Sequence, residues 1–195
     1  PPSFMQLVSS FPWVPQRPLS PCTTKHTHVQ YGEITPCAEG RFSVGLAADM
    51  GILSGKKGVV FGVANKRSIA WAIAQQFHAA GARLTVTYQN ERLGRTVLEL
   101  VKEMDYTQAV ECDVLDEVSV ASAIDAAAGT APLTTVAHCI AFANKDDLSG
   151  DFSATGIEGF RLALEVSAYS LLPVARIAAA RMSGGGSIMT LSFHA

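Results

Sequence analysis

From Lys57 onward, short apolar runs alternate with longer stretches whose apolar residues recur every three or four positions. The short runs predict strands over 58–61, 83–88, 109–112, 134–142 and 187–191. The longer stretches predict helices over 68–80, 92–104, 117–128 and 159–181. Strands that alternate with helices in this way return to one sheet through right-handed crossovers. The pattern therefore predicts a Rossmann-like, doubly wound α/β fold with a parallel sheet.

Two details refine the predicted helices. In 68–80, Ile69, Ile73 and Phe77 share one face, which we expect to point inward, and Gly81 is suited to end the helix in the left-handed conformation. In 159–181, Pro173 lacks the N–H that would bond to the carbonyl of Tyr169, so a kink is expected there.

Residues 1–49 differ in character from the rest of the chain. They hold seven of the nine prolines and show no sustained helical or strand period, and no charged stretch precedes an apolar core as in a secretory signal. We expect 1–49 to be a disordered extension outside the fold, or upstream DNA translated in frame. Met50 resembles the natural start of the folded part, 50–195.

Composition narrows the partners. The chain has 195 residues, 48% of them hydrophobic and 16% charged, with a net charge of −2. This balance fits one globular domain and favours neither nucleic acid nor an anionic membrane surface as a partner. The longest apolar candidate for a membrane span, 162–182, is interrupted by Glu165, Arg176 and Arg181, so no span is expected.

The cysteines point to a reducing compartment. Cys22, Cys37, Cys112 and Cys139 show neither paired nor metal-ligand spacing, which predicts free thiols and a cytoplasmic protein. His26 and His28 lie near Cys22, but that segment has no other sign of order, so no metal site is expected.

The residues that follow each predicted strand are the candidate ligand contacts, because ligands of such sheets bind at the carboxyl ends of the strands. After the first strand, Gly62 would let the backbone approach a phosphate, and Ser68 and Ile69 would open a helix whose N–H groups face an anion. An ordinary turn without a ligand fits the spacing equally well. Lys66 and Arg67 are interpreted as solvated loop charges.

The next two strands end in polar residues suited to adenosine. Gln89 is neutral, which favours NADH over NADPH at the position that reads the 2′-hydroxyl, although it also fits a plain loop residue. Asp113 would accept a hydrogen bond from the adenine amino group while Val114 packs on the ring. The alternative for Asp113 is a cap on the helix that begins near Asp116.

The fourth strand ends in small residues. Ala141 and Ala143 would leave room for nicotinamide, ribose and substrate beside the backbone. His138 lies within an apolar run, so a hydrogen-bonded core histidine is favoured over a catalytic base.

Several strings together resemble the bacterial enoyl-[acyl-carrier-protein] reductases, a branch of the short-chain dehydrogenase/reductase superfamily. They include G-V-A-N-K-R-S-I-A-W, T-Y-Q-N-E-R-L, C-D-V, A-H-C-I-A-F-A-N-K, S-A-Y-S-L-L and G-G-S-I-M-T-L-S, and they extend over 50–195. The resemblance implies NADH-dependent reduction of trans-2-enoyl thioesters carried on acyl carrier protein, in a homotetramer. It implies cofactor contacts at Gly62, Ser68, Ile69, Gln89, Asp113, Val114 and Ile140, and a backbone contact to substrate at Ala143.

The resemblance also has departures. Phe193 stands where the family has its first tyrosine, and the family's Tyr-x6-Lys pair does not follow. By this comparison the fold is incomplete at the C-terminus, and the chain as given would be inactive. The alternatives are a non-catalytic dinucleotide-binding fragment or module, and a different short-chain reductase, which would need the G-x3-G-x-G turn that is not found here.

Overall fold

The computed structural model describes residues 51–149 and 151–192, all of which lie within one compact unit. The predictions for the extension 1–49, for Met50 as a start and for Phe193 lie outside the described residues.

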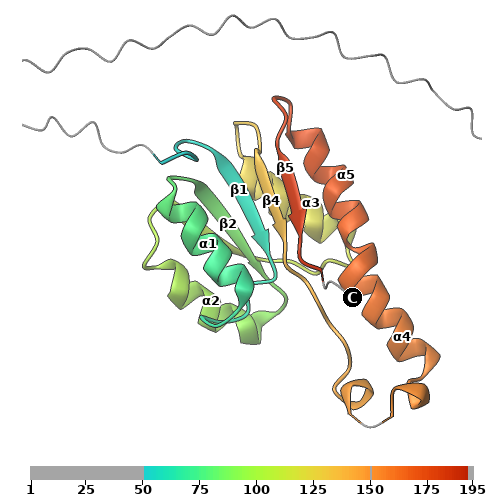
Figure 1. Cartoon of the computed structure of the whole chain (residues 1–195). Helices are drawn as coiled ribbons and strands as arrows, with labels where there is room; N and C mark the ends of the chain where they lie inside the picture. The colour runs from blue at the N-terminus through green and yellow to red at the C-terminus, as the bar shows by residue number, and fades with distance from the viewer. Residues whose placement is uncertain (1–50, 150, 193–195) are drawn as a thin grey trace, which may run out of the picture. The chain divides into compact units, whose positions relative to one another are not determined.

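One parallel sheet organises the described part of the chain (Figure 1). Its strands are β1 (Lys57–Phe61), β2 (Arg83–Tyr88), β3 (Thr107–Glu111), β4 (Thr135–His138) and β5 (Ser187–Thr190), in the spatial order β3-β2-β1-β4-β5. In the register, Val59 of β1 lies opposite Thr85 of β2 and Val136 of β4. From β1 to β3 the chain adds strands on one side of β1, and it then adds β4 and β5 on the other side. The topological switch point therefore lies between β1 and β4. The predicted Rossmann-like α/β fold is confirmed.

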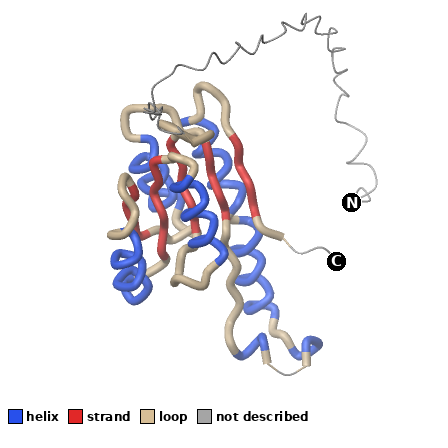
Figure 2. The backbone as a smooth tube through the Cα atoms, turned by 60° about the vertical axis from the view of Figure 1, so that its left-hand side comes forward, coloured by secondary structure: helices blue, strands red, loops and turns tan. Residues whose placement is uncertain are grey.

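Helices cover both faces of the sheet (Figures 1 and 2). On one side lie α1 (Ile69–Ala79) and α2 (Glu91–Val101), and on the other lie α3 (Glu117–Ala128) and α5 (Leu171–Arg181). Between β4 and α5, the chain runs through the short 3₁₀ helices Asp146–Leu148 and Phe152–Ala154, then α4 (Ile157–Leu164) and the π-helical turn η4 (Glu165–Tyr169).

The central strand explains why two cores form. Val59 and Phe61 of β1 are fully buried in the cluster shared with α3 and α5, whereas Val60 is fully buried in the cluster shared with α1 and α2. A strand covered on both faces reads as a continuous apolar run, as this one does. Each such side chain stabilises the fold by about 1.5–3 kcal/mol relative to an exposed position.

The structure corrects two predictions about these elements. β4 ends at His138 rather than at Phe142, since its neighbours β1 and β5 end at Phe61 and Thr190 and leave no further strand to pair with. In α1, Ile73 and Phe77 are partly buried against the core, as predicted, but Ile69 is 64% exposed, and the most deeply buried residues are Ala70, Trp71 and Ala74. Gly81 has the expected left-handed φ of 91°.

The helical run Ile157–Arg181 is irregular, but not where a kink was expected. The break is the π turn η4, in which Ser170 N–H bonds to Glu165 O at 3.0 Å, and Pro173 itself is buried inside α5. The turn therefore absorbs the irregularity one helical turn before the proline.

By length and composition, Ile157–Arg181 would also be able to cross a membrane, against the sequence expectation. Its most apolar window has a mean hydropathy of 1.4, and 28% of that window is buried. Core helices satisfy the same two criteria, and Val166, Val174 and Ala178 of this run are buried in the cluster that includes α3.

β5 lies at the edge of the described sheet. All four of its residues are exposed, and within residues 51–149 and 151–192 it pairs only with β4. Its position therefore depends on its contacts with β4 and with the residues behind it.

Candidate functional site

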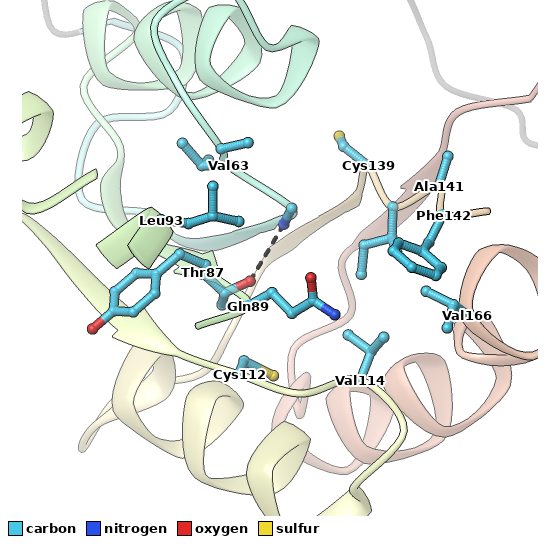
Figure 3. Close-up of a pocket in the computed structure, with 14 residues that line it drawn as sticks. Val63, Thr87, Gln89, Leu93, Cys112, Val114, Cys139, Ala141, Phe142 and Val166 are labelled. Atoms are coloured by element: carbon cyan, nitrogen blue, oxygen red, sulfur yellow. Dashed lines mark hydrogen bonds between the residues drawn. The ribbon is translucent and has the colours of Figure 1, made fainter. Parts of the chain in front are cut away.

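A pocket opens at the carboxyl ends of the strands, beside the switch point (Figure 3). It is lined by the last two residues of β2, by residues that follow β1, β2, β3 and β4, and by one residue each from α2 and η4. The lining includes Gly62, Val63, Gln89, Leu93, Val114, Ile140 and Val166. A second, adjoining pocket shares Gly62 and Ile140 and adds Ser68, Ile69, Ala70, Leu191 and Ser192. The fold thus gathers predicted site residues that lie far apart in the sequence.

Gly62 lies at the contact between the exits of β1 and β4. Its φ is +89°, and a β-carbon built on it would lie 2.3 Å from the carbonyl oxygen of Cys139. Only glycine fits this combination of left-handed backbone and close approach. Gly62 therefore keeps the floor of both pockets clear of side-chain atoms.

The start of α1 provides unpaired donors at the second pocket. Ser68 is the N-cap, and its Oγ accepts from Trp71 N–H at 3.3 Å. Ser68 N–H itself bonds to Asn65 O at 3.1 Å, so it is not one of the unpaired donors. Among the described residues, the N–H groups of Ile69 and Ala70 have no acceptor. Together with the positive end of the helix dipole, they form a surface that favours an anion.

The residues after β2 and β3 form the other end of the first pocket. Gln89 extends into it in Figure 3, and Val114 and Leu93 supply apolar walls. Asp113 does not line the pocket. Its Oδ1 accepts from Leu115 N–H at 3.0 Å, and the cap of α3 is Asp116, which leaves the predicted adenine contact of Asp113 without support from this geometry.

Two cysteines that the sequence reasoning did not place also line the first pocket. Cys112 is buried and Cys139 is half-buried, and burial raises the pKa of each thiol to about 11. Both thiols are therefore protonated at neutral pH and behave as small apolar groups that shape the wall. Both lie directly after a strand, at β3 and β4, but the sequence pattern predicted longer strands, 109–112 and 134–142, that include them.

The segment after β4 is held by the π turn. Ser167 Oγ accepts from Phe142 N–H at 3.0 Å and donates to Phe142 O at 3.2 Å, so one hydroxyl satisfies both backbone groups of that residue. Ile140 lines both pockets, and Ala143 is half-buried just beyond the clasped residue. The clasp fixes an otherwise irregular segment against the helical run.

His138 is a core histidine, as the sequence indicated. It is 1% exposed, with Nδ1 at 3.1 Å from Thr190 Oγ1 and Nε2 at 2.8 Å from Ser170 Oγ. Burial lowers its pKa below the ordinary 6.5.

Metal ligands are not gathered in the described part of the chain. Within 51–149 and 151–192, no group of three or more His, Cys, Asp or Glu side chains is placed to hold a metal ion. Cys22, Cys37, His26 and His28 lie outside these ranges.

A parallel sheet in this order, with a glycine turn and a helix start at its switch point, defines a Rossmann-like protein of the dinucleotide-binding class. Within that class, the chain belongs to the enoyl-acyl-carrier-protein reductase family. The family model described as Enoyl-(Acyl carrier protein) reductase matches residues 62–195.

Individual relatives agree with this assignment. The chain is 46% identical over 149 residues to the enoyl-acyl-carrier-protein reductase (NADH) FabI of Bacillus cereus, covering 74% of this chain and 57% of that protein. It is 44% identical over 145 residues to the corresponding protein of a Nostoc species, covering 72% and 56%. The chain thus spans somewhat more than half the length of these relatives.

Solved structures match in the same region. The Bacillus cereus reductase, crystallised with NADP⁺ and an indole naphthyridinone, superposes with a TM-score of 0.70 at 46% identity, covering 74% of this chain and 57% of that one. The Anaplasma phagocytophilum reductase in complex with NAD superposes with a TM-score of 0.68 at 38% identity, covering 73% and 56%.

Proposed function

We propose that the described domain binds NADH at the two adjoining pockets, and that the whole protein reduces trans-2-enoyl thioesters carried on acyl carrier protein. One observation carries the coenzyme proposal: the unpaired N–H groups of Ile69 and Ala70 lie at a pocket whose floor is free of side-chain atoms because residue 62 is a glycine. This arrangement fits a diphosphate, which needs backbone donors and close approach to the chain.

The residues divide into three groups along the bound coenzyme. Ile69 and Ala70 would hold the diphosphate beside Gly62 through their N–H groups, with Ser68 capping the start of the helix. Gln89 and Val114 would contact adenosine, and Asp113 would offer its Oδ2, since its Oδ1 already accepts from Leu115 N–H. Ile140 would pack beside the nicotinamide half, because it borders both pockets. The apolar lining by Cys112, Cys139 and Val114 supplies the flat, uncharged surroundings that an adenine ring needs.

The substrate would meet the segment after β4. When bound, the dihydronicotinamide ring supplies a hydride to the β-carbon of the enoyl thioester. The described residues would position the substrate. Ala143 would offer backbone groups to it, and the two hydrogen bonds between Ser167 and Phe142 hold that segment in place.

The choice of coenzyme follows from charge after β2. Gln89 is neutral. The position after β2 therefore carries neither an acid, which would bind the 2′-hydroxyl of NADH strongly, nor a base, which would bind the 2′-phosphate of NADPH. Relatives are named as NADH enzymes, although the Bacillus cereus structure holds NADP⁺. We propose a preference for NADH, since the nearest cation, Arg92, lies in the first turn of α2 and not in the loop after β2.

The whole protein is proposed to be a homotetramer. One apolar surface supports association. A shallow hollow formed by α4, η4 and the loop between β3 and α3 is lined by apolar residues that are between 47% and 67% exposed: Leu115, Ile157, Phe160, Leu164 and Tyr169. Exposed apolar surface of this kind marks a contact surface. We propose a cytoplasmic location because Cys112 and Cys139 are free thiols.

Binding and turnover are tested separately. Calorimetric titration of the 195-residue chain with NADH, NADPH and ADP should give saturable binding, tightest for NADH. The full-length protein encoded by the gene should oxidise NADH in the presence of a crotonyl thioester. Binding without turnover in the full-length protein would favour the non-catalytic dinucleotide-binding module. Absence of coenzyme binding by both proteins would contradict the proposal.

A further inference from the structure

The ring of His138 joins three elements behind the two pockets. Its backbone belongs to the last position of β4, its Nδ1 contacts Thr190 Oγ1 at the end of β5, and its Nε2 contacts Ser170 Oγ where α5 begins. The ring is 1% exposed and Ser170 is fully buried. Polar groups in such a buried site must find their hydrogen-bond partners within the protein.

The Ser170 hydroxyl fixes the tautomer of the ring. Ser170 Oγ donates its single hydrogen to Val166 O at 2.6 Å. Its 2.8 Å contact with His138 Nε2 therefore requires the ring nitrogen to be the donor. In a neutral ring, a hydrogen on Nε2 leaves Nδ1 bare, so Nδ1 accepts from Thr190 Oγ1–H at 3.1 Å.

This chain of donors has a direction and an end point. Thr190 donates to the ring, the ring donates to Ser170, and Ser170 donates to the carbonyl of Val166 inside the π turn. Within the described residues, the bond from Thr190 is the only side-chain hydrogen bond that reaches β5. The edge strand is thereby fixed to the helical layer as well as to β4.

His138 and Thr190 each lie one residue from the proposed coenzyme site. The wall after β4 begins at Cys139, one residue beyond His138, and the wall after β5 begins at Leu191, one residue beyond Thr190. Leu191 N–H also bonds to His138 O at 3.2 Å. A displacement of the ring would therefore move the two walls relative to each other.

We propose that His138 is a positioning residue which, as the neutral Nε2–H tautomer, ties Thr190 to Ser170 and so sets the spacing of the two pocket walls that follow β4 and β5. The claim on coenzyme affinity rests on the proposed function. The claim on the walls does not, because it concerns the protein without ligand.

The test uses Thr190→Val, which removes the hydroxyl but keeps the shape of the side chain. Thr190→Ser restores the hydroxyl. Thr135→Val is the matched control, because Thr135 lies on the neighbouring strand and its hydroxyl has no hydrogen-bond partner among the described residues. Each chain is titrated with NADH and with ADP, and amide and histidine ¹⁵N spectra are recorded without ligand.

We expect Thr190→Val to weaken NADH binding by about fivefold, which corresponds to the loss of one hydrogen bond. ADP binding should stay within about twofold, because the adenosine end of the site lies away from β5. Thr190→Ser and Thr135→Val should bind NADH as the parent chain does. The histidine spectrum should show a protonated Nε2 and a bare Nδ1, and Thr190→Val should shift the Cys139 and Leu191 amides.

Three results would overturn the inference. They are a bare Nε2 in the parent chain, unchanged Cys139 and Leu191 amides in Thr190→Val, or equal losses of ADP and NADH affinity, which would indicate general unfolding. If the parent chain binds neither ligand, the proposed function fails, and the spectra alone still decide whether His138 positions the walls.

Discussion

Gly62 and Cys139 meet so closely that a single added carbon would not fit between them: a β-carbon on Gly62 would lie 2.3 Å from Cys139 O. The contact joins the exits of β1 and β4, which are the two central strands at the switch point. The proposed coenzyme site depends on this approach, because both pockets include Gly62 and Cys139.

Gly62→Ala should therefore lower both stability and coenzyme affinity. The left-handed φ and the overlap with Cys139 O should together reduce the free energy of unfolding by about 2–4 kcal/mol. Urea unfolding and NADH titration measure the two effects. Gly185→Ala is the matched control, because Gly185 has a φ of +78° but nothing within 4 Å of its added carbon. It should lose about 1 kcal/mol and bind NADH normally; equal NADH affinities for the two variants would contradict the assignment of Gly62.

Substitutions at Ser68 should separate capping from anion binding. Ser68→Asn keeps a side-chain acceptor for Trp71 N–H and should preserve both stability and NADH affinity. Ser68→Asp also caps the helix, but its charge should repel a diphosphate at the start of α1. Ser68→Ala should cost about 1 kcal/mol of stability. Thermal unfolding and calorimetry check all three, and tight NADH binding by Ser68→Asp would place the diphosphate elsewhere.

Burial of His138 makes stability depend on pH in a defined direction. The pKa of His138 is lowered in the folded chain, whereas unfolding restores the ordinary 6.5, so the unfolded chain takes up a proton that the folded chain does not. The free energy of unfolding should be retained above about pH 6.5 and should fall as the pH drops toward the lowered pKa, by at most ~1.4 kcal/mol per pH unit. Urea unfolding between pH 7.5 and pH 5 (roughly the histidine range) measures this dependence.

The comparison variant for the pH effect is His138→Gln, which keeps an amide donor in the buried site but does not titrate. Its own stability will be lower, so the informative quantity is the slope against pH rather than the absolute value. The parent chain should show the steeper decline below pH 6.5. Parallel curves for the two chains would assign the pH dependence to other groups.

Charge on the apolar surface of α4 should disrupt self-association. Phe160 is 47% exposed and lies beside Arg161, Leu164 and Ile157 in the shallow hollow on α4. Phe160→Glu should reduce the mass of the assembly that the full-length protein forms, as measured by sedimentation, because burying an unpaired carboxylate in an interface is costly. Leu98→Glu on α2, where the parent residue is 45% exposed, should leave the assembly unchanged. An unaltered tetramer with Phe160→Glu would place the interface on another surface.

Local sequence patterns predicted the bounds of an element correctly where residues at its two ends mark them. The predicted bounds 83–88 and 117–128 match β2 and α3, because a β-branched run and the Asp116 cap with Gly129 define them. The extent of β4 was not predictable in this way. The apolar run continues past His138, and only the lengths of β1 and β5 show where pairing stops.

The candidate site was predicted in outline but not in detail. Gly62, Gln89, Val114 and Ile140 reach the first pocket, because the residue after each parallel strand must lie at the same edge of the sheet. The roles of Ser68 N–H and Asp113 depended on hydrogen bonds to Asn65 and Leu115, which compete with a ligand and are not apparent from residue type. The Ser167 clasp joins residues 25 positions apart and could not be inferred from spacing.

The π turn η4 has a consequence for the helical run that contains it. One additional residue in a turn rotates everything that follows by about 100°, the angle between successive residues in an α-helix. The apolar stripe of α4 and the buried stripe of α5 are therefore out of phase if the run is drawn as one continuous helical wheel. The insertion lets one run of residues present Phe160 to the outside and Val174 to the core.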